Sequence, residues 1–218
     1  MATLQSGTSP GQRVKAGDLV LDRAKGAPIT PIKKRVDGFA KVHRELVKAQ
    51  AAAQKAVAAH VAQERKIGEA DDAQDASVGE LAGALVGAGA PRLKPFQGYS
   101  EHSPSDLAGM PQQKQARELV KIASKCAKHP DARVKKAASA ARAAAEKLLA
   151  AEKPLAALAR ERSAAIAARD AIGPRWEKAF SALKRAAKSA EDDGATGLFA
   201  ALFEVEGPAR KKTTKKGE

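Results

Sequence analysis

The longest regular pattern of apolar and polar residues covers residues 131–190, a run rich in Ala, Lys and Arg. In a heptad that places Val134 at position a, every d position is apolar, and the a series is interrupted only by Arg162 and Arg169. Apolar residues at most e positions widen this seam into the stripe that a helix buries in a bundle. Because alanines dominate the seam, we expect close approach between helices rather than a core of bulky side chains.

Two prolines interrupt this predicted long helix, Pro154 and Pro174. Each removes a backbone hydrogen bond and is expected to kink or split the helix. The heptad phase survives both prolines, which favours a kink over a chain reversal at Pro154. A glycine stands directly before Pro174, so the second proline is the expected site of a true break.

Apolar residues also recur at every seventh position of 32–67 and predict a first long helix there. At ~1.5 Å per residue this helix is roughly 50 Å long, which makes it a natural packing partner for the run at 131–190. Gly68 is expected to end it. Ser77 and Glu80 have the spacing of a capping box and predict a separate helix over 77–88.

The segments between these patterns divide the chain. Residues 1–31 are rich in Gly, Ser, Thr and Pro and are expected to form a flexible arm. An N-terminal helical half is predicted over 32–90 and a C-terminal helical half over 111–205. Between them, residues 91–110 hold prolines, glycines and two aromatic residues, and are expected to be an irregular connection. Residues 206–218 are expected to be a disordered basic tail.

The C-terminal half is predicted to begin with a helix over 111–128, broken by a His-Pro pair. Asp131 then caps the long helix, and so short a break allows an antiparallel hairpin. Near the end, a short amphipathic helix over 196–203 carries two phenylalanines. Together with Trp176 and Phe180, these residues are expected to form an apolar plug at one end of the bundle.

Composition agrees with these helices, because aromatic residues make up 3% of the chain and runs of strand-favouring residues are absent. The predicted fold class is all-α, an elongated antiparallel helical bundle built from long helical hairpins with an Ala-rich heptad seam. No stretch approaches the ~18 apolar residues of a spanning helix, and no secretory signal is evident at the start. A cytoplasmic location is therefore expected. The absence of Asn, together with abundant Ala, is typical of a GC-rich bacterial coding sequence.

Charge is the second strong feature of the chain, with a formal net charge of +14. Residues 111–190 hold 19 basic and 7 acidic residues, so the positive field lies on the predicted long helices. Basic faces of this kind attract phosphates without reading base sequence. The candidate nucleic-acid-binding residues are Lys135, Lys136, Arg142, Lys178, Lys184, Arg185 and Lys188 on the helix and Lys211, Lys212, Lys215 and Lys216 in the tail. The same positions are also where any bundle carries solvated charge.

Arg162 and Arg169 lie one heptad apart on the seam. One interpretation is that they reach the rim or pair with carboxylates of the facing helix. The other is that they mark a gap in the bundle that accepts an anionic partner.

Motifs of catalysis are absent from the sequence: there is no phosphate-binding Gly-rich loop, no HExxH pair and no Gly-x-Ser-x-Gly elbow. Cys126 falls on the packing face of its predicted helix and is expected to be a small buried hydrophobe. The four histidines are expected to be structural or surface residues, with His43 and His60 near the apolar side of the first long helix. No metal, cofactor or small-molecule substrate is predicted.

The sequence therefore favours a non-enzymatic helical scaffold that acts by packing with a protein partner or with itself. The alternative is a nucleoid-associated type of protein that binds nucleic acid independently of sequence. A third reading, a role at a membrane surface for residues 77–88 or 196–203, would need association with liposomes to support it.

Overall fold

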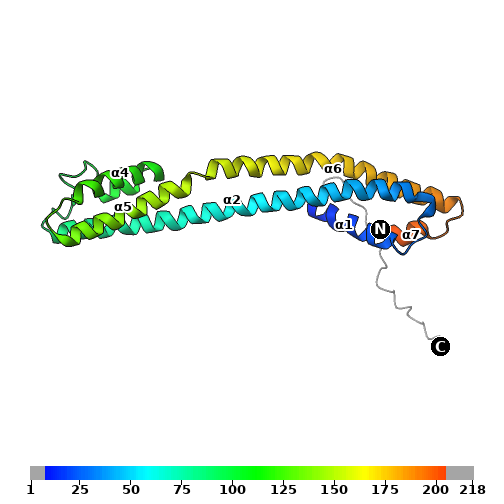
Figure 1. Ribbon diagram of the computed structural model, residues 1–218, viewed down its shortest axis with the longest axis horizontal. Coiled ribbons are helices and arrows are strands. Elements are labelled where there is room, and N and C mark those ends of the chain that lie inside the picture. The colour runs from blue at the N-terminus through cyan, green and yellow to red at the C-terminus, as the bar shows by residue number, and fades with distance from the viewer. Residues whose placement is uncertain (1–7, 205–218) are drawn as a thin grey trace, which may run out of the picture. The chain divides into compact units, whose positions relative to one another are not determined.

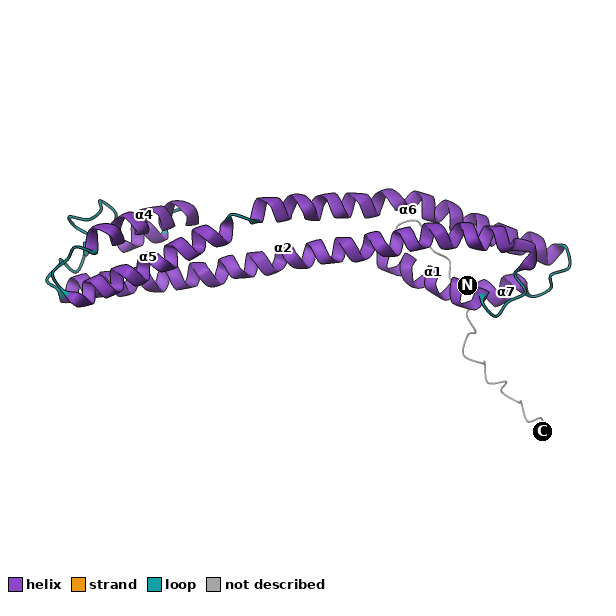
Figure 2. Cartoon of the chain, viewed as in Figure 1, coloured by secondary structure: helices purple, strands orange, loops and turns teal. Residues whose placement is uncertain are grey.

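The computed structural model describes residues 8–204, and within that range the chain is all-α and contains no strand. Residues 1–7 and the predicted tail over 206–218 lie outside the description. The elements labelled in Figure 1 are α1 (Pro10–Ala24), the short 3-10 helix η1 (Thr30–Ile32), α2 (Lys33–Gly87), α3 (Pro104–Ala108), α4 (Gln112–Cys126), α5 (Ala132–Glu152), α6 (Leu155–Asp192) and α7 (Leu198–Phe203). Figure 2 shows the loops that join them.

These helices form two compact units that do not follow the predicted halves 32–90 and 111–205. Unit 1 combines Met1–Lys55 with Ser163–Glu218, and unit 2 is Ala56–Arg162. Helices α2 and α6 each contribute residues to both units. The prediction of sequential halves is wrong because antiparallel pairing of long helices brings the first part of α2 beside the last part of α6.

Unit 1 is built around an aromatic core between α2 and α6. Phe39 of α2 lies 5.5 Å from both Trp176 and Phe180 of α6, measured between ring centroids. Helix α7 adds Phe203, whose ring centroid is 5.7 Å from that of Phe180. The predicted gathering of large aromatic residues around the C-terminal helix is thus confirmed within this unit.

The flexible arm predicted over 1–31 is wrong for the residues that form α1. This helix begins with a capping box, in which the Ser9 hydroxyl accepts from the Gln12 amide and the Gln12 side chain accepts from the Ser9 amide. Its buried side joins the core of unit 1 through Val20, and one of its buried positions is Gly17. Because a glycine occupies a core-facing position, no apolar period marks this helix in the sequence.

Unit 2 packs α4 and α5 against the second part of α2. The Gln63 amide of α2 donates to the Ala151 carbonyl of α5 at 2.6 Å. Helices α4 and α5 form the predicted antiparallel hairpin, and the Asp131 carboxylate caps α5 by accepting from the Arg133 amide at 2.7 Å. The Ala-rich heptad seam is confirmed along α5, whose buried residues are Val134, Ala138, Ala141, Ala145 and Leu148.

The connection predicted over 91–110 is irregular apart from the short helix α3. It is nevertheless well packed, because the side chains of Phe96 and Leu107 are buried in the core of unit 2. The predicted packing of its aromatic residues is therefore confirmed for Phe96.

Helix α2 does not end at Gly68, and no separate helix begins at Ser77. The Ser77 hydroxyl donates to the Gln74 carbonyl at 2.7 Å, so it does not act as an N-cap. The apolar side of α2 continues through Ile67 and Leu81, both of them buried. A glycine inside a helix costs about 1 kcal/mol relative to alanine. Burial of the continuous apolar side outweighs this cost at Gly68.

The interruption predicted at Pro154 is found, whereas the true break predicted at Pro174 is wrong. The helix is interrupted at Pro154, between α5 and α6, whereas Pro174 lies inside α6. Gly173 is buried, and a Cβ there would lie 2.9 Å from Arg13 Nη1. The absence of a side chain at Gly173 therefore allows Arg13 of α1 to approach α6 closely, and the glycine does not end the helix.

Candidate interaction surfaces

The described residues contain no grouping of metal-binding side chains. Across residues 8–204, no set of three or more His, Cys, Asp or Glu side chains could hold a metal ion. Cys126 is buried, and this burial raises the pKa of its thiol to about 11. Because the thiolate is the reactive form, the side chain acts as the small hydrophobe that the sequence predicts.

His43 forms a buried polar bridge in unit 1. Trp176 Nε1 can only donate, so it donates to His43 Nδ1, at 3.1 Å, and the imidazole proton is placed on Nε2. Nε2 in turn donates to Asp18 Oδ1 of α1 at 2.9 Å. Both ring nitrogens are therefore satisfied, and the histidine ties α1 to α2 and α6 as a structural residue.

Arg162 contacts the second buried histidine, within unit 2. The Arg162 Nη1 lies 3.3 Å from His60 Nδ1, and Glu64 Oε2 lies 3.2 Å from the same nitrogen. The Arg162 guanidinium thus contacts α2, where it lies beside the His60 imidazole. The same imidazole contacts the Glu64 carboxylate. The predicted pairing of seam cations across helices is realised here through histidine rather than directly with a carboxylate.

Arg169, in unit 1, pairs within its own helix. Its guanidinium lies 2.8 Å from Asp170 Oδ1, and its side chain is 21% exposed. This carboxylate neutralises the cation locally, which differs from the expected pair with the facing helix. Binding of an anionic partner at Arg162 and Arg169 stays a prediction.

The predicted nucleic-acid-binding residues separate into two groups. In the first, Arg142 pairs with Glu146, Lys188 pairs with Glu191 and Asp192, and Lys184 lies over the rings of Phe180 and Phe203. The second group is exposed and makes no ion pair within the described chain: Lys135 and Lys136 in unit 2, Lys178 and Arg185 in unit 1. The tail residues Lys211, Lys212, Lys215 and Lys216 lie outside the described residues.

A further set of cations was not singled out by the sequence analysis. Lys34, Lys41, Lys48 and Lys55 lie on α2 in unit 1, and all four are exposed. Their spacing of seven residues is visible in the sequence, although the excess of basic over acidic residues is larger over 111–190. This set is called the lysine row below.

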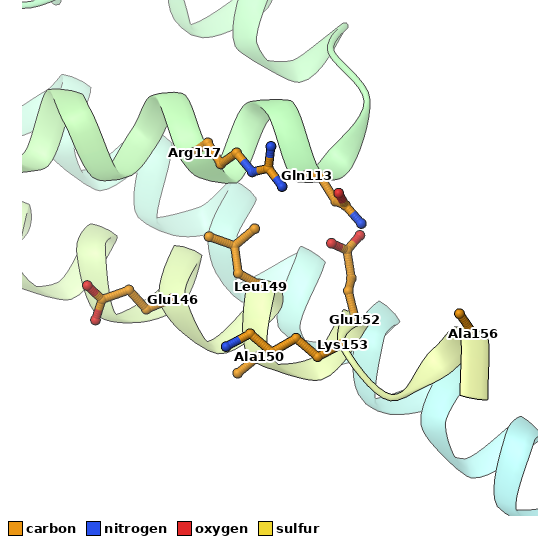
Figure 3. A pocket seen from close by; sticks show the side chains of 8 residues that line it. All are labelled: Gln113, Arg117, Glu146, Leu149, Ala150, Glu152, Lys153 and Ala156. Carbon is orange, nitrogen blue, oxygen red and sulfur yellow. The ribbon is translucent and has the colours of Figure 1, made fainter. Parts of the chain in front are cut away.

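Unit 2 also contains a groove beside the end of α5, with a volume of about 560 Å³. Figure 3 shows Gln113 and Arg117 of α4 above it and Leu149 and Glu152 of α5 below. Burial raises the pKa of Glu152, and the nearby Asp71 carboxylate adds to the effect. The lining contains two cations and two carboxylates, which are Arg117, Lys153, Glu146 and Glu152. Neither sign of charge dominates, so the groove indicates no ligand class.

The two segments considered for a membrane-surface role, 77–88 and 196–203, fall largely within α2 and α7. None of the described helices is both long enough and apolar enough to cross a membrane. The glycines of the predicted segment 77–88 do not serve close packing either, because a Cβ at Gly79 or Gly83 would meet no atom within 4 Å.

Comparison of the whole chain with protein-family models, with curated proteins and with solved structures gives no match.

Proposed function

We propose that the protein is a non-enzymatic helical scaffold that self-associates by packing exposed flanks of its helices against a second copy. The observation that carries this proposal is a set of valines left exposed on α2. In unit 1, α1 covers one flank of α2 as far as His43, which bonds to Asp18. One turn further along the same flank, Val47 is 37% exposed.

Unit 2 repeats this arrangement on its own part of α2. Near the C-terminal end of the helix, α4 covers the flank through hydrogen bonds from Gln112 to Asp71 and from Gln115 to Asp75. Nearer the start of the unit, Val57 and Val61 are 38% and 55% exposed. Each unit therefore leaves part of an apolar flank without a covering helix.

The chemistry of the flank in unit 1 favours a second copy as the occupant. Next to Val47 lie Ala51 and Gln54, both exposed and uncharged. A symmetric pair uses one surface twice and needs no other protein.

Variants on the two flanks test the proposal by light scattering coupled to size-exclusion chromatography. Replacing Val47, Val57 and Val61 with Glu adds three charges to the flanks, and we expect the mass to fall from that of an oligomer to that of a monomer. The matched control places the same three charges at exposed alanines elsewhere on α2, Ala52, Ala59 and Ala62. A wild-type protein that is monomeric at all concentrations, or equal dissociation of both variants, would overturn self-association.

Sequence-independent binding of nucleic acid is a second candidate function. It is favoured by the exposed cations that have no carboxylate partner within the described range, including Lys135, Lys136, Lys178 and Arg185. The described surface near them offers no aromatic platform for base stacking, since all the ring pairs in unit 1 lie in or beside its core. Binding should therefore be to phosphates and should weaken steeply with salt. Fluorescence anisotropy of a generic duplex across a salt series tests it.

The absence of catalysis and a cytoplasmic location are parts of the same proposal. The burial of Cys126 and the hydrogen bonds made by both ring nitrogens of His43 support the proposal that the protein is not an enzyme. A single cysteine also leaves no intramolecular disulfide that would need an oxidising compartment.

A further inference from the structure

The lysine row is a regular feature of the outer face of α2 in unit 1. Lys34, Lys41, Lys48 and Lys55 follow one another at intervals of seven residues. In an α-helix this interval is close to two turns, so neighbouring lysines are separated by about 10 Å along the axis and the row spans about 30 Å. Phe39, Leu46 and Ala53 each follow one of the first three lysines by five residues. They are buried, on the side of α2 opposite to the lysines.

The row is not compensated by carboxylates. The same part of α2 contains Asp37 and Glu45, and both are engaged elsewhere. Asp37 lies 3.1 Å from Lys33, and Glu45 lies 3.0 Å from Arg175 of α6. None of the four lysines makes an ion pair with any residue of the described chain.

Some of the other exposed cations are paired along their own helices, whereas Lys135, Lys136, Lys178 and Arg185 are not. Lys25 pairs with Asp22, Lys121 with Glu118, Arg142 with Glu146 and Lys188 with Glu191, each three or four residues away. Such local pairs are the ordinary way in which a helix surface balances its charge. The lysine row departs from this arrangement over three successive heptads.

We propose that the lysine row is the principal site at which the protein binds the phosphate backbone of a nucleic-acid duplex. The inference rests on the second candidate function above and assigns it to a surface of unit 1. A line of uncompensated cations about 30 Å long matches a linear polyanion, which carries phosphates at regular intervals over one helical turn. Each lysine that neutralises a phosphate releases condensed counterions, and this release supplies the binding free energy.

The surroundings of the row favour a nucleic acid over a membrane. Small side chains lie beside the lysines, such as Gly38, Ala51 and Ala52, all exposed. Insertion into a bilayer uses large apolar or aromatic side chains on the face that meets the membrane. The aromatic residue of this part of α2, Phe39, is buried on the opposite side. Readout of base edges is not expected either, because lysines in a row act as point charges on phosphates.

The test compares two quadruple variants that remove the same charge. In one, Lys34, Lys41, Lys48 and Lys55 are replaced with Ala. In the other, four exposed cations that already have carboxylate partners are replaced, namely Lys25, Lys121, Arg142 and Lys188. Anisotropy of a labelled 20-base-pair duplex of arbitrary sequence is followed from about 50 to 200 mM salt, where phosphate contacts lose most of their affinity.

We expect the row variant to lose most of its affinity, with the slope of log K against log salt falling by about 1 for each lysine removed. The paired-cation variant should keep nearly the wild-type slope. A third variant with Arg at all four row positions should bind like the wild type. Circular dichroism and the fluorescence of Trp176, the only tryptophan, check that every variant keeps its fold.

The outcomes separate this inference from the function on which it rests. If the two alanine variants lose affinity equally, binding depends on net charge alone and the row is not the site, while nucleic-acid binding itself stands. If the wild-type protein binds no duplex at the lowest salt, both the inference and the second candidate function fail. Vesicles of anionic lipid serve as the competing probe. Row-dependent binding to vesicles without binding to the duplex would overturn the assignment to nucleic acid.

Discussion

Gly17 of α1 lies directly against the ring of His43 of α2, and a Cβ built on the glycine would stand 2.2 Å from His43 Nδ1. No side chain fits that space unless the imidazole or the helix moves. The imidazole is held on both sides, by Asp18 and by Trp176. The absence of a side chain at this position is therefore what allows α1 to dock in unit 1.

Gly17→Ala should destabilise the protein even though alanine is the better helix former. The methyl group overpacks a filled site, for which a loss of about 1–3 kcal/mol in the free energy of unfolding is usual. Chemical denaturation followed by Trp176 fluorescence measures it. Gly11→Ala in the same helix is the control, because a Cβ there meets no atom within 4 Å. That variant should be neutral or gain about 0.5–1 kcal/mol. Equal effects of the two substitutions would contradict the account of the contact.

The hydrogen bond between Trp176 and His43 should appear as a coupling free energy. His43→Leu leaves the indole N–H buried without an acceptor, a loss of about 1–3 kcal/mol. Trp176→Phe removes the donor from the same bond. A double-mutant cycle measured by circular dichroism, which does not need the tryptophan, should give a coupling of about 0.5–3 kcal/mol. A coupling near zero would show that the two side chains act independently.

Cys126 should make the stability of the protein depend on pH in the alkaline range. Burial raises the pKa of the folded thiol from 9.0 to about 11. The unfolded thiol therefore ionises first as pH rises, and the stabilising contribution, complete below pH 9, is lost progressively up to about pH 11. Denaturation midpoints of the wild type and of Cys126→Ala should converge over this window. At pH 8 the native thiol should also react with a disulfide reagent far more slowly than the unfolded chain. A thiol that reacts at the same rate in both states would contradict its burial.

Pro174 lies inside α6 and removes one of its backbone hydrogen bonds. Pro174→Ala restores an amide donor to the helix, and we expect the free energy of unfolding to rise by about 1–3 kcal/mol. Pro10→Ala is the control, since a proline at the first position of a helix leaves no hydrogen bond unmade. It should change stability little. Loss of stability in Pro174→Ala would mean that the proline shapes α6 in a way that its packing requires.

The parts of the fold that could be predicted from the sequence are those with a long apolar period. The seam of 131–190 correctly places Val134, Leu148, Trp176 and Leu183 in the cores of their units. A repeated period needs no knowledge of the partner helix, because the amphipathic face alone specifies what is buried. The all-α class and the hairpin of α4 and α5 follow from the same signal.

The parts that were missed depend on contacts between distant segments. Helix α1 buries Gly17 beneath His43, so the position that matters most for its packing carries no apolar side chain. In the same way, Gly173 accommodates Arg13 from α1, although beside a proline it resembles a helix break. Local propensity cannot reveal such roles, because the reason for the glycine lies more than 20 residues away in the chain.

The candidate surfaces could be predicted only in part. The sequence identifies exposed cations on the long run, but it does not tell that Arg142 and Lys188 are paired while Lys135 and Lys178 are not. Ion pairs depend on rotamers and on the register between neighbours. The lysine row, by contrast, can be identified from the sequence once the buried side of α2 is known, because the four lysines lie on the opposite face.

Sedimentation velocity of the wild-type protein over a wide concentration range tests the central claim most directly. If the valine flanks pack against a second copy, the weight-average sedimentation coefficient should rise with concentration toward a value for a defined oligomer. The variant with Glu at Val47, Val57 and Val61 should sediment as a monomer throughout, with unchanged circular dichroism. A wild-type protein that sediments as a monomer of 22.7 kDa at every concentration would contradict the proposal that this chain is a self-associating scaffold.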